Sequence, residues 1–232
     1  MKLFAIGDLH LSGAVDKPMN IFGDNWIGHD KIIFDDWKEK VSNEDVVLIV
    51  GDISWASKLQ DARVDLDRIS ECPGKKYLIR GNHDYWWGTA TALNKLYEDD
   101  MNFMNTKYET LGEYAICGSR GWICPNEHCF EEKDFEIYKR EANRLKISLE
   151  SARKDGFDKF IVIMHYPPTN EKFENSFFMD IINEYKPEHV IYGHIHGKEN
   201  FKYGLQGELN GVNFHLVSCD YLDFKLKEIF IK

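Results

Sequence analysis

The chain has 232 residues, of which 43% are hydrophobic and 29% charged, so it has the composition of an ordinary globular protein with enough apolar material for a packed core. Its formal net charge of −10 disfavours general binding to nucleic-acid backbones and to anionic membrane surfaces. The length suits a single domain over residues 1–232. No apolar run reaches the ~18 residues of a membrane span, so we expect no membrane partners. Because no signal peptide is recognisable and the five cysteines are an odd number, we expect the protein to be located in the cytoplasm.

Short aliphatic runs alternate with amphipathic segments, as they do in chains built from βαβ units. Strands are expected at 2–7, 46–50, 77–79, 160–164 and 189–192, and helices at 30–41, 54–72, 134–154 and 176–185. The last two strands, 212–218 and 224–231, are expected to be antiparallel. The order predicts an α/β fold in layers, a layered α/β/β/α sandwich with mixed central sheets and with helices outside.

Polar side chains follow the end of each expected strand, where open α/β sheets form their ligand sites. They are two aspartates, one asparagine and five histidines: Asp8, His10, Asp52, Asn82, His83, His165, His194 and His196. Burying so many titratable groups together without a metal would cost roughly several kcal/mol for each group. A donor set of Asp, Asn and His without thiolates suits ions such as Mn, Fe or Zn. The sequence therefore predicts a metal site at the carboxyl ends of the strands.

These residues stand in five short motifs, whose order carries a family resemblance. The motifs are Asp8-x-His10, Gly51-Asp52, Gly81-Asn82-His83-Asp84, His165 and Gly193-His194-x-His196. In that order they resemble the five blocks of the calcineurin-like metallophosphoesterase superfamily. The resemblance implies a dinuclear site of two divalent or trivalent metal ions, Mn, Fe or Zn, that share one bridging aspartate. One ion would be held by Asp8, His10, Asp52 and His196, and the other by Asp52, Asn82, His165 and His194.

The same resemblance implies two catalytic residues, His83 beside the leaving group and Asp84 orienting it. Two metal ions attract phosphate locally on a protein that is negatively charged overall, and they lower the pKa of a shared water toward ~7. The resulting metal-bridging hydroxide would attack a phosphoester in line. His83, as an imidazolium, would donate a proton to the departing alkoxide, and the nearby Asp84 would favour that charged form.

Departures from the protein Ser/Thr phosphatases narrow the substrate class. Those enzymes usually continue their second block as Gly-Asp-x-Val-Asp-Arg-Gly and end their third in Glu, whereas here Gly51-Asp52 is followed by Ile53-Ser54 and the third block ends in Asp84. The chain is thus similar to the bacterial phosphohydrolase and phosphodiesterase branch, and a small phosphodiester or nucleotide is the expected substrate. A phosphomonoesterase of the protein-phosphatase type and a non-catalytic scaffold on the same fold are the alternatives.

Three further residues near the motifs are candidates for substrate contact. Trp55 and Trp86 could stack on an aryl group or a nucleobase, which is worth about 1–3 kcal/mol per base, or they could pack the outer wall of the site. Arg120 could clamp a phosphate oxygen, or it could simply be solvated. The sequence leaves open the roles of His29, Cys124 and Cys129, and the oligomeric state.

Overall fold

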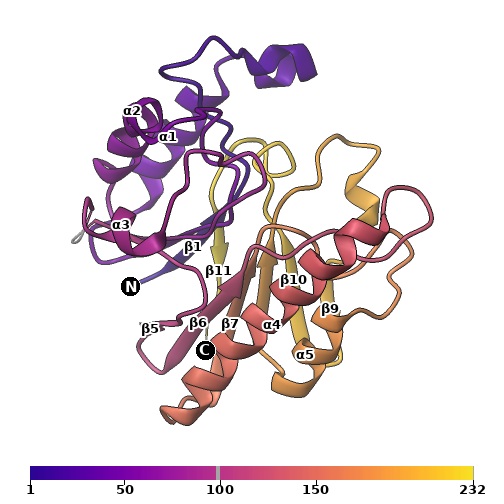
Figure 1. Cartoon of the computed structure of the whole chain (residues 1–232). Helices are drawn as coiled ribbons and strands as arrows, with labels where there is room; N and C mark the ends of the chain where they lie inside the picture. Colours follow the sequence, from indigo (N-terminus) through magenta and orange to yellow (C-terminus); the bar gives the residue numbers. More distant parts are fainter. Residues whose placement is uncertain (98–99, 232) are drawn as a thin grey trace.

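Two β-sheets lie face to face at the centre of the molecule, and helices cover the outer face of each (Figure 1). The structure is a computed structural model that describes residues 1–97 and 100–231. The strand order is β11-β1-β2-β3-β4 in the first sheet and β5-β6-β7-β8-β10-β9 in the second. This arrangement confirms the predicted α/β/β/α sandwich with mixed sheets.

The first sheet has four parallel strands and one antiparallel edge strand. Strands β1 to β4 pair in chain order, and β11 pairs antiparallel with β1. Parallel neighbours need long crossover connections, which here include the helices on the outer face. The strands are β1 (Leu3–Ile6), β2 (Val46–Ile49), β3 (Lys75–Leu78), β4 (Met101–Phe103) and β11 (Lys227–Ile229).

The second sheet is parallel at its centre and antiparallel at both edges. Strands β6, β7, β8 and β10 are parallel, and β5 and β9 flank them as antiparallel edge strands. Its carboxyl ends therefore point to the same end of the molecule over four neighbouring strands. The strands are β5 (Glu109–Leu111), β6 (Tyr114–Ser119), β7 (Lys159–Met164), β8 (His189–Tyr192), β9 (Gly207–Leu209) and β10 (Val212–Leu216).

Helices pack on the two outer faces of the sandwich (Figure 1). The first sheet carries α1 (His29–Lys40), α2 (Leu59–Ser70) and α3 (Ala90–Asn94), and the second carries α4 (Glu132–Lys154) and α5 (Phe177–Tyr185). Short 3-10 helices lie in the loops: η1 (Met19–Phe22), η2 (Asp24–Trp26) and η3 (Phe201–Tyr203). In the part of the chain that the structure describes, none of the helices is both long and apolar enough to cross a membrane.

The central strands are apolar on both faces because both faces are covered. In β2, Val47 and Ile49 pack with the helices outside, whereas Val46 and Leu48 pack against the second sheet. Strand β7 divides its side chains in the same way between α4 and α5 on one side and the first sheet on the other. A continuous hydrophobic run in this sequence therefore marks a strand buried between two layers.

Two sequence expectations need correction. Helix α2 begins at Leu59, not at residue 54, because the N–H groups of Ile53 and Ser54 donate to the buried carboxylate of Asp84. The last two strands do not pair with each other: β10 lies parallel to β8, and β11 lies antiparallel to β1 in the other sheet. Strand β11 is thus the antiparallel edge strand of the first sheet, and the local sequence pattern does not reveal this pairing.

Candidate metal centre

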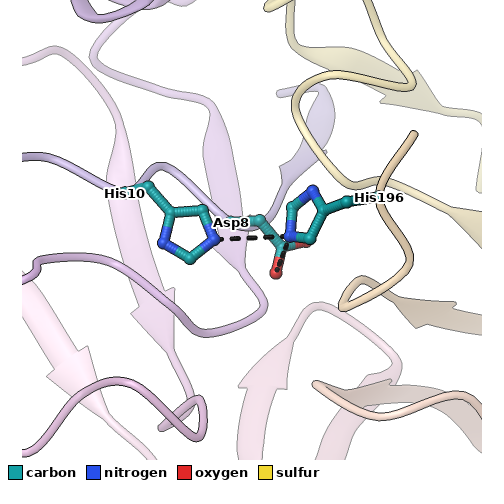
Figure 2. A group of neighbouring side chains, drawn as sticks. All are labelled: Asp8, His10 and His196. Atoms are coloured by element: carbon teal, nitrogen blue, oxygen red, sulfur yellow. Dashed lines mark hydrogen bonds and ion pairs between the residues drawn. The ribbon is translucent and has the colours of Figure 1, made fainter. Parts of the chain in front are cut away.

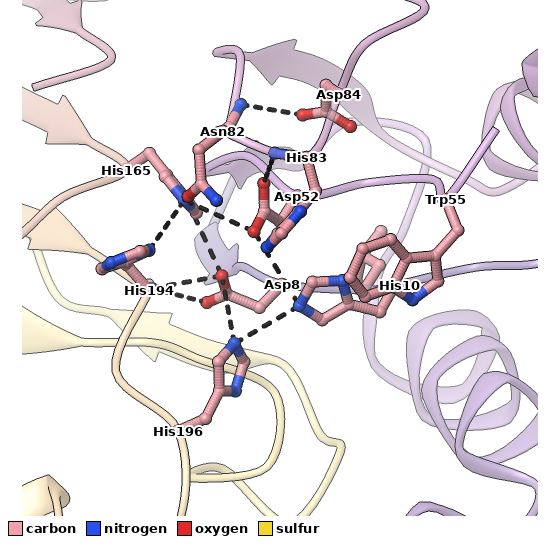
Figure 3. A network of polar contacts seen from close by, with 12 residues as sticks. Asp8, His10, Asp52, Trp55, Asn82, His83, Asp84, His165, His194 and His196 are labelled. Atoms are coloured by element: carbon pink, nitrogen blue, oxygen red, sulfur yellow. Dashed lines mark hydrogen bonds and ion pairs between the residues drawn. The ribbon is translucent and has the colours of Figure 1, made fainter. Parts of the chain in front are cut away.

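The eight motif residues come together at the carboxyl ends of the strands (Figure 3). They follow β1, β2, β3, β7 and β8, which belong to both sheets. Four of them have a left-handed backbone, with φ between 46° and 72°: Asp8, His10, Asp52 and His194. Such a backbone is unfavourable for residues other than glycine and persists only where the surrounding structure imposes it. The chain therefore bends sharply after the strands to aim these side chains at one another.

One glycine is required for this close approach. A Cβ atom on Gly81 would clash with the backbone nitrogen and the carboxylate of Asp52. The loops after β2 and β3 therefore meet at a point where position 81 has no room for a side chain.

The first group of potential ligands comprises Asp8, His10 and His196 (Figure 2). Their ligand atoms all lie within 4.8 Å of one another. His10 Nε2 and His196 Nε2 are 3.3 Å apart, and His196 Nε2 is 3.7 Å from Asp8 Oδ1. Two imidazole nitrogens and one carboxylate oxygen form a ligand set that suits zinc, manganese or iron.

The second group comprises Asp52, His165 and His194, with Asn82 beside them. His165 Nδ1 lies 2.9 Å from the carbonyl oxygen of Val50, and because a carbonyl only accepts, this nitrogen carries the proton. Burial lowers the pKa of His165, so the ring is neutral and its Nε2 presents a lone pair. That lone pair faces Asn82 Oδ1 at 2.7 Å and Asp52 Oδ2 at 3.5 Å. His194 Nδ1 also lies 3.2 Å from His165 Nε2, and the ligand atoms of Asp52, His165 and His194 all lie within 4.8 Å of one another, close enough to share one cation.

Asp52 lies between the two groups. Its Oδ2 is 3.5 Å from His165 Nε2 in the second group and 3.9 Å from His10 Nε2 in the first. Its Oδ1 accepts a hydrogen bond of 2.8 Å from the backbone N–H of His83. This position supports the bridging role that the family resemblance implies for Asp52.

The pKa values of three side chains are shifted at the positions where cations would bind. Burial, with help from the charge of Asp8, raises the pKa of Asp52 to about 7. Burial lowers the pKa of His194 to about 3. Burial also opposes the charged form of His196, but the carboxylates of Asp220 and Asp8 outweigh it and raise the pKa of His196 to about 10. Bound cations would stabilise ionised Asp52 and would replace the proton of His196. The side chains therefore fit two metal ions.

His83 lies next to both ligand groups, and its backbone N–H is hydrogen-bonded to Asp52. Its ring centroid is 4.5 Å from that of Trp55 and 5.9 Å from that of His10. The ring is half-buried and lines a cavity in front of the metal ligands. Burial is the main cause that lowers the pKa of His83, and neighbouring positive charges act in the same direction, so the surroundings do not favour the imidazolium form that was expected from Asp84. A substrate in the cavity can thus reach this imidazole.

Asp84 does not orient the His83 ring, which corrects the expectation from the resemblance (Figure 3). Its carboxylate is fully buried and turned toward the loop after β2. It accepts hydrogen bonds of 2.8 to 3.3 Å from the backbone N–H groups of Ile53, Ser54 and Gly81 and from the indole N–H of Trp86. Burial and the charge of Asp52 raise the pKa of Asp84 to about 6. Asp84 therefore joins the loops that carry Asp52 and Asn82.

Replacing Asp84 by alanine should destabilise the fold. Each buried donor left without an acceptor costs about 1–3 kcal/mol, and several donors would lose their partner, so we expect a loss of at least ~3 kcal/mol in the free energy of unfolding. Urea unfolding of the metal-free protein measures it. The control is Asp30→Ala, which removes a partly exposed ion pair with Arg68 and should cost less than ~1 kcal/mol. Equal losses in the two variants would contradict the assigned role of Asp84.

Asp220 supports the first group and was missed in the sequence. Its Oδ1 accepts a hydrogen bond of 2.9 Å from His196 Nδ1, and its Oδ2 accepts one of 2.9 Å from the N–H of Gly197. The bond fixes the His196 ring so that Nε2 faces Asp8 and His10. Carboxylates that hold ligating imidazoles in this way tune metal affinity. Asp220 follows shortly after strand β10, so the search for polar residues after strands would have found it if extended to that strand.

Replacing Asp220 by asparagine should weaken metal binding. The amide keeps the size of the side chain but loses the charge that supports His196, so we expect the affinity for one Mn²⁺ ion to fall about 10-fold, at the lower end of the usual range for such partners. Calorimetric titration of the metal-free protein measures this affinity. Asp223→Asn is the matched control, because Asp223 also lines the cavity but is exposed. An unchanged affinity in Asp220→Asn would show that Asp220 does not support the metal.

The cavity in front of the metal ligands has a volume of about 660 Å³, and Trp55 is one of its walls. The His10 ring stacks on Trp55 with centroids 4.7 Å apart, and Lys17 Nζ lies 3.3 Å from the Trp55 ring centroid. At these distances the two groups cannot share one face of the indole. Both faces of Trp55 are therefore covered, and the expected face-on stacking with a substrate would require Lys17 to move.

The other candidates for substrate contact do not line this cavity. Trp86 is only 3% exposed and packs in the core beside Trp87, with its indole N–H bound to Asp84. The Arg120 guanidinium lies over the Trp122 ring at 4.6 Å and 3.7 Å from a carboxylate oxygen of the buried Glu141. Both ring nitrogens of His29, whose role the sequence left open, lie 3.0 Å from backbone carbonyl oxygens in the interior.

Comparison with curated proteins gives two informative relatives. The Gene 66 protein of Mycobacterium phage D29 is 38% identical over 90 residues, which cover 35% of this chain and 43% of the phage protein. An uncharacterized metallophosphoesterase of Helicobacter pylori is 22% identical over 219 residues, 93% of this chain and 50% of that protein. The chain thus spans half or less of the length of these curated relatives.

Solved structures align over almost the whole chain, and a family model matches most of it. The TT1561 protein of Thermus thermophilus aligns over 99% of this chain and 98% of its own, with a TM-score of 0.60 and 12% identity. A protein of unknown function from Aquifex aeolicus, AQ665, aligns over 98% and 95%, with a TM-score of 0.53 and 18% identity. These likenesses show a shared fold. The model of the calcineurin-like phosphoesterase family matches residues 1–198, so the chain belongs to the calcineurin-like phosphoesterases.

Proposed function

We propose that this protein is a metal-dependent phosphohydrolase that cleaves a small phosphodiester or a nucleotide at a dinuclear site. Membership of the family supports metal-dependent hydrolysis of phosphoesters in general. The observation that carries the dinuclear interpretation is the position of Asp52, whose Oδ2 lies within 4 Å of an imidazole nitrogen in each ligand group. No ligand position of the five motifs is lost, which favours an enzyme over a scaffold.

The ligands have separate roles in this proposal. Asp8, His10 and His196 would hold one ion, Asn82, His165 and His194 the other, and Asp52 both. Two bound ions would supply Lewis-acid stabilisation of the phosphoryl oxygens and would lower the pKa of a water. The chain itself contributes buried carboxylates that offset the repulsion between the ions and loops that hold the ligands in place. His83, which faces the cavity, would donate a proton to the leaving oxygen.

The preference for diesters rests on the motifs and on the cavity. The last motif has both histidines, and the third ends in Asp84, unlike the usual pattern of the protein phosphatases. A cavity of about 660 Å³ suits a small molecule, since ligand pockets usually measure roughly 300–1,000 Å³. The overall charge of −10 disfavours long nucleic acids as substrates.

Hydrolysis of bis(p-nitrophenyl) phosphate by the Mn²⁺-loaded protein tests this function. We expect turnover that stops when a chelator removes the metal, and a higher kcat/KM than with p-nitrophenyl phosphate or a phosphoserine peptide. The control is Asp8→Asn, which removes a ligand of the first group. Turnover that survives in Asp8→Asn would come from a contaminant, and absence of turnover of every ester would contradict the proposed enzyme. A higher kcat/KM with the monoester would support a phosphomonoesterase instead.

A further inference from the structure

The cavity reaches well beyond the metal ligands. Five site residues form its floor: His10, Asp52, His83, His194 and His196. Besides Trp55, the remaining walls come from η1 and η2, from residues 197–201 and from residues 220–224. These segments belong to three different loops, all at the carboxyl ends of the strands. A molecule bound at the metals would therefore extend into the part of the same cavity that lies between these three loops, the compartment.

Apolar side chains dominate the walls of this compartment, and one of them, Trp26, also lies beside the ligands His10 and His196, with ring centroids 6.0 and 5.8 Å apart. Met19, Trp26 and Phe224 form a buried part, in which the Trp26 and Phe224 rings meet edge to face with centroids 5.1 Å apart. Phe22 stands at the rim with 60% of its surface exposed, and Phe201 is half-buried. Unlike Trp55, Phe22 has much of its surface free for contact with a ligand. Such walls favour a substituent that is apolar or aromatic.

The charged groups around the compartment oppose a second phosphate. Glu199 and Asp223 are exposed at its walls. Among the described residues that line it, there is one lysine, Lys198. Asp220 is also negative, although it is paired with His196. The Debye length is about 8 Å at physiological salt, so carboxylates in the same small cavity act on a bound ligand. Three carboxylates thus outnumber two lysines, Lys198 and the Lys17 that lies over Trp55, so a phosphate away from the metals would meet net negative charge.

We propose that the substrate is a phosphodiester with a single phosphorus atom, one of whose substituents is an aromatic or otherwise apolar group that fills this compartment. This inference rests on the proposed function, because the reacting phosphoryl group is placed at the metal ligands. It assigns recognition of the substituent to Phe22 and Phe201 and to the buried wall behind them. It also excludes pyrophosphates and nucleoside polyphosphates, whose additional charges would face Glu199 and Asp223.

Binding to the Mn²⁺-loaded protein tests the apolar part without turnover. Calorimetry would compare phenyl phosphate with methyl phosphate, which carry the same phosphoryl group and differ in the substituent. We expect phenyl phosphate to bind about 10-fold or more tightly, and Phe22→Ala to weaken phenyl phosphate about 3- to 10-fold while leaving methyl phosphate unchanged. The matched control is Ile21→Ala, since Ile21 is 69% exposed in the same short helix but does not line the cavity.

Thymidine 5′-monophosphate and thymidine 5′-diphosphate test the charge. We expect the monophosphate to bind at least ~5-fold more tightly, and the double variant Glu199→Gln with Asp223→Asn to reduce that difference. Equal affinity for phenyl and methyl phosphate, or equal effects of Phe22→Ala and Ile21→Ala, would overturn the apolar compartment. Tighter binding of the diphosphate would contradict the proposal that the substrate has a single phosphorus atom. Absence of turnover would refute the proposed function alone, because these measurements need only binding.

Discussion

Replacing Asp52 by asparagine should remove more metal and more activity than replacing a ligand that belongs to one group only. The carboxylate lies within reach of imidazoles in both groups, and an amide neutralises none of the repulsion between two cations. Loss of an outer partner of a metal ligand typically costs 10- to 100-fold, so loss of the shared carboxylate should lower kcat/KM by more than about 100-fold. Metal analysis of the purified variant and assay with bis(p-nitrophenyl) phosphate measure both effects.

The comparison variant is His10→Asn, which removes a ligand from the first group only. It should retain one ion per chain, whereas Asp52→Asn should bind both ions weakly. The Oδ1 of an asparagine at position 52 can still accept the backbone N–H of His83, so the variant should keep the His83 loop in place. Two tightly held ions per chain in Asp52→Asn would show that Asp52 does not bridge.

Replacing His83 by asparagine should leave metal binding intact and slow the reaction selectively. The imidazole lines the cavity but belongs to neither ligand group. The backbone N–H of His83 is hydrogen-bonded to Asp52. We expect a loss of ~10²-fold or more in kcat for a diester with an alkoxide leaving group, which needs a proton. With a p-nitrophenolate leaving group the loss should be much smaller, since that anion needs little protonation.

Equal losses with the two leaving groups would exclude proton donation by His83. A lower metal content in the His83→Asn variant would instead show that His83 is a metal ligand. His128→Asn is a suitable control, because it makes the same substitution at a histidine whose side chain is 74% exposed and does not line the cavity.

The sequence predicted the fold and the convergence of the motif residues because both depend on local patterns. A buried strand followed by a polar residue can be recognised in one segment, as at Val46 to Asp52 or Phe160 to His165. Parallel strands then bring their carboxyl ends to one edge without further information. The division of the ligands into two groups does not follow from that rule; it came from the resemblance of the five motifs to the metallophosphoesterase superfamily.

The remaining features depend on side-chain directions that no local pattern encodes. Asp84 stands next to His83 in the chain, yet its carboxylate turns to the N–H groups of a different loop. Trp86 is close to the ligands in sequence but points into the core, whereas Trp26 and Phe224 reach the cavity from distant loops. Asp220 meets His196 only because β10 lies beside β8 in the second sheet.

Electron paramagnetic resonance of the Mn²⁺-loaded protein tests the central claim most directly. Two manganese ions that share the Asp52 carboxylate would lie roughly 3.5–4 Å apart, as in other two-metal sites, and would be magnetically coupled. We predict two ions per chain and the multiline spectrum of a coupled pair, which Asp52→Asn abolishes. A single ion per chain, or two ions with the spectrum of isolated Mn²⁺, would contradict a dinuclear site bridged by Asp52.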